Sequence, residues 1–202
     1  GAIDGNGVRL DIEEAADICG CDYILNVVLD EDKRVVKAVA GDHRAAHRVG
    51  CAFLDELYKV RLPRLADIVI ATPGGYPKDI NLIQAHKAMD NAAGFVRDGG
   101  TLVLLAECAD GVGSTGLLPF FDLGGREQAF DQLVRDYSGN GGTALALMAK
   151  SSRIRIRLLT GLDPEVCRRI GLRPITIAAA EQLLRAEAES SAVIANASLL
   201  VR

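Results

Sequence analysis

The chain has 202 residues, and its 23 basic and 27 acidic side chains give a formal net charge of −4. This acidic balance argues against a general nucleic-acid-binding protein, which would present a basic field. No apolar run is long enough to cross a membrane, and no charged segment followed by an apolar run indicates a secretory signal. We therefore expect a cytoplasmic protein that binds neither nucleic acid nor membranes.

The cysteines support the same expectation. There are five of them at irregular spacing, which makes a poor disulfide framework. Cys19 and Cys21 are separated by one residue, which is too close for the usual zinc-binding pair. We expect reduced thiols, several of them buried as small hydrophobic side chains.

The first third of the chain predicts a helix, a hairpin and a second helix. Apolar spacing indicates a short helix that ends at Gly20, and residues 23–29 and 34–39 are expected to be the two strands of a β-hairpin. A helix should follow from Asp42 to about Lys59. The Asp42 carboxylate can cap it by accepting a hydrogen bond from a free amide of the first turn.

From residue 66 onward, apolar strands alternate with helices. Strands are expected at 66–71, 101–106, 154–159 and 192–197, and helices at 79–96, 127–137, 143–150, 164–170 and 178–188. Gly99 and Gly100 should end the helix at 79–96. Residues 66–106 form a β-α-β unit, whose strands must be parallel. We therefore predict an α/β fold: a layered Rossmann-like domain with a mostly parallel sheet and an N-terminal hairpin region. Residues 1–202 are expected to form a single α/β domain.

Two loops are candidates for ligand binding because they follow neighbouring strands of that unit. Ligands of open parallel sheets bind at the carboxyl ends of the strands. The first loop, residues 72–79, carries Gly74, Gly75, Tyr76 and Asp79, and the second, residues 107–114, is also rich in glycine. We expect the two loops to lie side by side. Neither has the glycine spacing of a dinucleotide- or phosphate-binding loop, so turn formation is an alternative role for these glycines.

The helix after the first loop offers two polar side chains. Gln84 and Lys87 are three residues apart and therefore share one helix face. Together they could present an amide and an ammonium group to an anion or a carbonyl oxygen. From spacing alone, a solvated helix face is the alternative interpretation.

Other patterns that could indicate a metal site or a catalytic nucleophile are weaker. His43 and His47 have a spacing that can hold a metal ion, but the intervening residues do not match a metalloprotease motif and Arg44 and Arg48 disfavour a cation. We expect no metal site in this chain. Cys108 follows a strand without a histidine near it in sequence, so a cysteine nucleophile has little support, and no nucleophile-elbow motif occurs.

Several stretches resemble the C-terminal domain of the nickel-dependent lactate racemase (LarA) family. They are residues 22–29, 40–48, 66–70, 74–88 and 107–113. The most specific of them runs from Gly-Gly-Tyr-Pro at residue 74 to Gln-x-x-Lys, which ends at Lys87. The resemblance implies an isomerase that racemises or epimerises a small 2-hydroxy acid by hydride transfer, in an active site between two domains.

The resemblance also implies what this chain lacks. In that family a nickel pincer nucleotide is attached to a lysine of the N-terminal domain, which also supplies the nickel-binding and catalytic histidines. We therefore expect a C-terminal fragment of a longer two-domain protein, with its own N-terminal domain as partner, no cofactor bound to this part and no activity in isolation. Gln84 and Lys87 match the glutamine and lysine that the C-terminal domain contributes to catalysis. Gly74, Gly75, Tyr76 and Asp79 are expected to face the substrate or the cofactor.

The chain departs from the family in one respect, and two alternative functional hypotheses are left. The chain has no tryptophan, whereas well-known lactate racemases have one near the site, which indicates another 2-hydroxy acid or a diverged member. A non-catalytic α/β module that binds an anionic ligand or a partner protein is a second hypothesis, and an apolar patch around residues 73–79 would argue against it. A flavodoxin-like or dinucleotide-binding enzyme is supported by fold analogy only.

Overall fold

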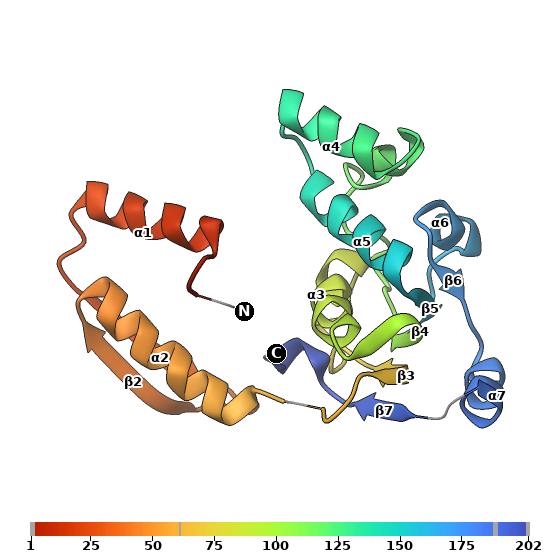
Figure 1. Ribbon diagram of the computed structural model, residues 1–202, viewed down its shortest axis with the longest axis horizontal. Helices are drawn as coiled ribbons and strands as arrows, with labels where there is room; N and C mark the ends of the chain where they lie inside the picture. The colour runs from red at the N-terminus through yellow and green to blue at the C-terminus, as the bar shows by residue number, and fades with distance from the viewer. Residues whose placement is uncertain (1–2, 61, 188–189, 201–202) are drawn as a thin grey trace. The chain divides into compact units, whose positions relative to one another are not determined.

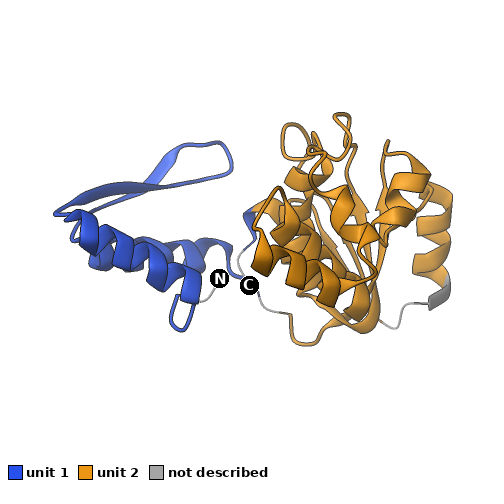
Figure 2. Cartoon of the chain, turned by 90° about the horizontal axis from the view of Figure 1, so that it is seen from above, with its two compact units in different colours: residues 1–61, 199–202 blue, residues 62–198 orange. Residues whose placement is uncertain are grey.

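The chain divides into two compact units. The computed structural model describes residues 3–60, 62–187 and 190–200. One unit comprises residues 1–61 and 199–202, and the other comprises residues 62–198 (Figure 2). The strands of the N-terminal hairpin pair with each other and with no described strand of the larger sheet. The expectation of a single domain over residues 1–202 stays a prediction.

The first unit contains the predicted hairpin between two helices. Its elements are α1 (Gly7–Cys19), β1 (Ile24–Leu29), β2 (Val35–Gly41) and α2 (His43–Tyr58). The strands are antiparallel. Asp42 caps α2 as predicted, because its carboxylate accepts hydrogen bonds from the backbone amides of Arg44 and Ala45 at 3.1 and 2.8 Å.

The first unit buries few of its apolar side chains. Val28, Val39 and Ala46 are buried. On the other face of β1, Leu25, Val27 and Leu29 are 73%, 43% and 42% exposed. A two-stranded hairpin needs a further packing element, and α2 packs against both of its strands. The hairpin therefore leaves one apolar face uncovered by the described residues.

The second unit is built on a parallel sheet, which confirms the predicted α/β class. Five strands lie in the order β6-β5-β4-β3-β7, and every described pair is parallel. The strands are β3 (Ala66–Ala71), β4 (Val96–Leu105), β5 (Arg155–Leu159), β6 (Arg173–Pro174) and β7 (Ser191–Ile194). The helices are α3 (Leu82–Ala93), α4 (Arg126–Arg135), α5 (Gly141–Arg153), α6 (Pro164–Arg169) and α7 (Ile177–Glu187), with short 3₁₀ turns at Leu118–Asp122 and Ala197–Leu199.

The order of the strands determines where the helices lie. From β3 to β6 the chain moves in one direction across the sheet, and right-handed crossovers place α3, α5 and α6 on one face. The chain then returns past β3 to β7, and the same rule places α7 on the opposite face. Figure 1 shows α3 beside α5, and α7 apart from both. Fully buried side chains of β3 and β4, among them Val69, Leu102 and Leu104, form the centre of the core.

Two element boundaries differ from the predicted ones. Gly99 and Gly100 were expected to end a helix, but they lie inside β4, where the pairing with β3 is irregular. A side chain at Gly100 would approach the carbonyl oxygen of Asp67 to 2.8 Å, so the close approach of the two strands requires glycine there. The preceding helix, α3, begins at Leu82 instead of residue 79 because residues 79–81 are used in loop contacts.

Candidate functional site

Two loops at the carboxyl ends of β3 and β4 lie side by side, as predicted. Four backbone hydrogen bonds of 2.8 to 3.3 Å join the second loop to residues 79–83, which are the end of the first loop and the start of α3. In each bond the backbone amide of the first residue donates to the carbonyl oxygen of the second: Cys108 to Asp79, Asp110 to Ile80, Leu82 to Gly111, and Ile83 to Val112. The second loop is therefore held against the first loop and the start of α3.

The same contacts occupy the free backbone amides at the N-terminus of α3. The amides of Leu82 and Ile83 donate to the second loop, and the amide of Gln84 donates to the Asn81 side chain at 3.0 Å. A β-carbon at Gly113 would lie 2.4 Å from the Asn81 side chain, so glycine is needed for this fit. Helix N-termini often bind anions through free amides, but in α3 these three amides are already occupied.

Gln84 and Lys87 form a pair on α3. The Lys87 Nζ donates a hydrogen bond to the Gln84 Oε1 at 2.8 Å, with Lys87 exposed and Gln84 half-buried. Because the amide oxygen accepts this bond, the amide nitrogen keeps its two protons for another acceptor. The pair thus presents ammonium and amide donors that could bind an oxyanion or a carbonyl oxygen.

The first loop also contacts the segment after β7. The Thr72 Oγ1 donates to the carbonyl oxygen of Ala195 at 2.6 Å, and the Lys78 Nζ donates to the Asn196 Oδ1 at 3.3 Å. Gly74 has a φ of 99°, and a β-carbon there would lie 2.6 Å from the Asn196 Oδ1. Gly74 therefore allows a close approach to Asn196, a residue that the sequence did not single out.

The remaining predicted residues of the loop do not join the Gln84–Lys87 pair. Tyr76 is 81% exposed, and no atom would lie within 4 Å of a β-carbon at Gly75. Among the described residues, no hydrogen bond or ion pair joins Gln84 or Lys87 to Tyr76 or Asp79. Tyr76 and its exposed neighbour Pro77 make a small apolar surface on this loop, whereas most exposed large hydrophobic residues of the described chain lie in the first unit.

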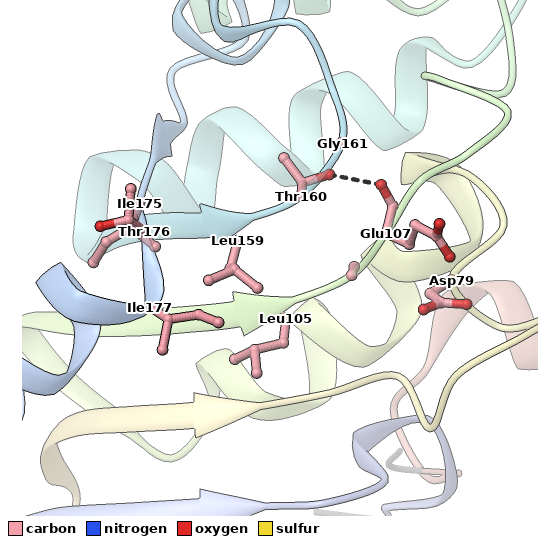
Figure 3. Close-up of a pocket in the computed structure, with 10 residues that line it drawn as sticks. Asp79, Leu105, Glu107, Leu159, Thr160, Gly161, Ile175, Thr176 and Ile177 are labelled. Atoms are coloured by element: carbon pink, nitrogen blue, oxygen red, sulfur yellow. Dashed lines mark hydrogen bonds between the residues drawn. The ribbon is translucent and has the colours of Figure 1, made fainter.

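Asp79 instead lines a pocket of about 530 Å³ at the carboxyl ends of β4 and β5 (Figure 3). Side chains of Leu105, Leu159 and Ile177 give the pocket an apolar wall. At its rim, the Thr160 hydroxyl and the Gly161 amide donate to the carbonyl oxygen of Glu107 at 3.1 and 2.8 Å. The carboxylates of Asp79 and Glu107 make one end acidic. Thr160 and Gly161 directly follow a predicted strand, so their position at this edge could have been inferred.

The structure disfavours Cys108 as a nucleophile. Its side chain is 2% exposed, and burial raises the pKa of its thiol. A raised pKa keeps the group as the weakly nucleophilic thiol.

His43 and His47 have different neighbours. The His43 Nε2 lies 3.3 Å from the Asp17 Oδ1, and the His47 Nε2 lies 3.5 Å from the Cys51 Sγ. Over the described ranges, no three His, Cys, Asp or Glu side chains are grouped to hold a metal ion. Likewise, none of the helices in the described part combines the length and apolar character needed to span a bilayer.

Comparison with known proteins identifies relatives of the region that carries these loops. Residues 63–144 match the family model of the lactate racemase C-terminal domain, which confirms the resemblance noted in the sequence. A lactate racemase of Lactiplantibacillus plantarum is 45% identical over 112 residues, which are 55% of this chain and 26% of that protein. A lactate racemase of Thermoanaerobacterium thermosaccharolyticum is 40% identical over 121 residues, 60% of this chain and 28% of that protein.

Two solved structures resemble the whole chain. The lactate racemase apoprotein from Thermoanaerobacterium thermosaccharolyticum superposes with a TM-score of 0.88 at 26% identity, over 100% of this chain and 50% of that one. A Thermotoga maritima protein superposes with a TM-score of 0.66 at 14% identity, over 98% of this chain and 53% of that one. The second likeness concerns the fold alone. The chain thus spans about half the length of these structural relatives.

Proposed function

Because residues 63–144 match the family model of the lactate racemase C-terminal domain, we propose that this chain is part of a racemase or epimerase of a small 2-hydroxy acid. The observation that carries the proposal is the Gln84–Lys87 pair, joined at 2.8 Å on a helix that begins at the carboxyl edge of the sheet. The family resemblance implies a role for these two residues in the active site, and their geometry gives them donors suited to such a substrate.

The two donors match the chemistry of the proposed substrate. A 2-hydroxy acid carries a carboxylate beside a hydroxyl-bearing carbon, and both groups offer oxygen acceptors. The Lys87 ammonium would bind the carboxylate by a charge-assisted hydrogen bond. The Gln84 amide protons would bind a second oxygen, on the substrate or the cofactor. An ammonium group held near an oxygen that gains negative charge during reaction also stabilises the transition state.

The cofactor and the second domain are part of the proposal. A nickel pincer nucleotide supplies a hydride acceptor when it is bound. The described residues offer no group of three metal-binding side chains, so the nickel would take its ligands from another part of the protein, which we propose to be the protein's own N-terminal domain. Gln84 and Lys87 offer hydrogen-bond donors rather than metal ligands, and they therefore fit contact with the substrate or with polar atoms of that group.

Racemisation by the longer protein tests the proposal. The protein with its N-terminal domain would be produced together with nickel and the cofactor-building enzymes, and single-enantiomer 2-hydroxy acids would be converted and analysed by chiral chromatography. We expect conversion of at least one acid to its mirror image, and a loss of about 100-fold or more in Lys87→Ala. Lys59→Ala, which removes an ammonium group from an exposed ion pair in the first unit, is the matched control and should keep full activity.

The result also separates the two functional hypotheses. Full activity in Lys87→Ala would remove Lys87 from the mechanism, and racemisation by the 202-residue chain alone would contradict the need for a second domain. A loaded protein that converts none of the acids would favour a non-catalytic module. The donors of Gln84 and Lys87 would then serve to bind an anionic ligand.

A further inference from the structure

Strands β5 and β6 lie at one edge of the sheet (Figure 1), and together they carry three arginines on one face. Arg155 and Arg157 are two residues apart on β5 and therefore point to the same side. Arg173 on β6 is the register partner of Arg157, so it shares that side. The Arg155 Nε donates to the hydroxyl of Thr101, its register partner on β4, at 3.3 Å. We call Arg155, Arg157 and Arg173 the arginine face.

The charges of the arginine face are not neutralised by the described part of the chain. None of its members has a carboxylate among the described residues within ion-pair distance, whereas the nearby Arg169 pairs with Asp122. The Nε of Arg157 is buried and has no hydrogen-bond partner among the described residues. Like charges on paired strands repel each other, and a buried donor without a partner is unfavourable. A bound anion would relieve both costs.

The arginine face opens into a hollow that suits a small ligand. Arg157 and Arg173 line a hollow of about 580 Å³, which is also lined by Arg168, itself paired with Glu165. That volume is in the range of small-molecule pockets. Two guanidinium groups side by side can each bind a phosphate group through two parallel hydrogen bonds. We propose that the arginine face binds a small ligand through its phosphate groups.

This site is separate from the proposed active site. Arg155 is the first residue of β5, so the arginine face begins at the amino end of the strand, whereas Thr160 and the loops of the candidate site follow the carboxyl ends. The Gln84–Lys87 pair lies on α3, the crossover between β3 and β4, which are not edge strands. The two sites can therefore be altered independently.

Calorimetric titration with inorganic pyrophosphate at low ionic strength tests the proposal on the 202-residue chain. We expect one saturable site in the unaltered chain and an affinity lower by about tenfold or more in Arg157→Gln/Arg173→Gln, which removes two of the charges. Arg135→Gln removes an exposed arginine at the end of α4 and should bind as the unaltered chain does. Lys87→Ala should also bind normally, because it alters only the proposed active site.

Thermal unfolding gives a second measurement of pyrophosphate binding that does not require the double variant. Pyrophosphate should raise the unfolding temperature of the unaltered chain and of Arg135→Gln, and it should raise that of the single variant Arg173→Gln less. Absence of saturable binding, equal affinity in the double variant, or loss of binding in Lys87→Ala would each overturn the proposal. Binding of hexaglutamate without binding of pyrophosphate would also overturn it, and would indicate an acidic protein segment instead.

Discussion

At the scale of single residues, His86 couples stability to pH. Its Nε2 lies 3.2 Å from the Nζ of Lys150 on α5, which is in turn 2.6 Å from a carboxylate oxygen of Asp90. Burial, together with the Lys150 charge, lowers the pKa of His86 to about 4 from its ordinary 6.5. Between those values the unfolded chain binds the proton and the folded chain does not. Folding stability should therefore fall as the pH drops from about 6.5 to 4, by up to about 3 kcal/mol.

Urea unfolding at pH 7.5 and pH 5 measures this effect. His86→Gln keeps a hydrogen-bonding side chain but cannot be protonated, so its stability should change less between the two pH values than that of the unaltered chain. His43→Gln, which alters a histidine facing Asp17, is the control and should keep the dependence that His86 causes. An identical pH dependence in His86→Gln and in the unaltered chain would show that another group is responsible.

At the scale of secondary-structure elements, the cap of α3 should contribute measurably to stability. The Asn81 Oδ1 accepts from the Gln84 amide at 3.0 Å, and the Asn81 side chain also packs against Gly113 of the second loop. Asn81→Ala should lower the free energy of unfolding by about 1 kcal/mol or more. Asn140→Ala is the matched control, because Asn140 precedes α5 without a side-chain capping bond. Equal losses in urea unfolding of the two variants would argue against a special role of the α3 cap.

The elements also show which parts of the fold could be predicted from the sequence. Ala66–Ala71 is apolar on both faces, a pattern typical of a central parallel strand, and it lies between β4 and β7. Local patterns do not say which strands pair. They therefore did not predict that the hairpin strands form a sheet of their own among the described residues. Gly99 and Gly100 were misplaced because a glycine pair that ends a helix has the same composition as one that allows an irregular strand pairing.

The candidate site was predictable in part for similar reasons. The three-residue spacing of Gln84 and Lys87 predicted a shared helix face, and the hydrogen bond between them agrees with it. The order of strands and loops predicted that the first and second loops would be neighbours. Asn196 is distant in sequence from the first loop, and only the strand order of the folded sheet, in which β7 lies beside β3, brings the two together. The roles of Gln84 and Lys87 in catalysis stay predictions.

At the scale of the whole molecule, the two units should differ in local stability. The second unit has a core of fully buried side chains such as Val69, Leu102 and Leu158, whereas the first unit buries little more than Val28, Val39 and Ala46. Amides open more readily where fewer apolar contacts must be broken. In hydrogen exchange on the 202-residue chain, amides of β1 and β2 should exchange at least about tenfold faster than those of β3 and β4.

Hydrogen exchange of the 202-residue chain can also be compared with that of the longer protein, which includes the proposed N-terminal domain. If the open face of the hairpin is covered by the proposed N-terminal domain, adding that domain should slow exchange in β1 and β2 and leave β3 and β4 nearly unchanged. The apolar side chains Leu25, Val27 and Leu29 would then leave water, and their burial would stabilise the hairpin. Equal protection of both sheets in the 202-residue chain would mean that the first unit is stable without such a cover. Unchanged exchange of the hairpin in the longer protein would mean that the N-terminal domain does not cover its apolar face.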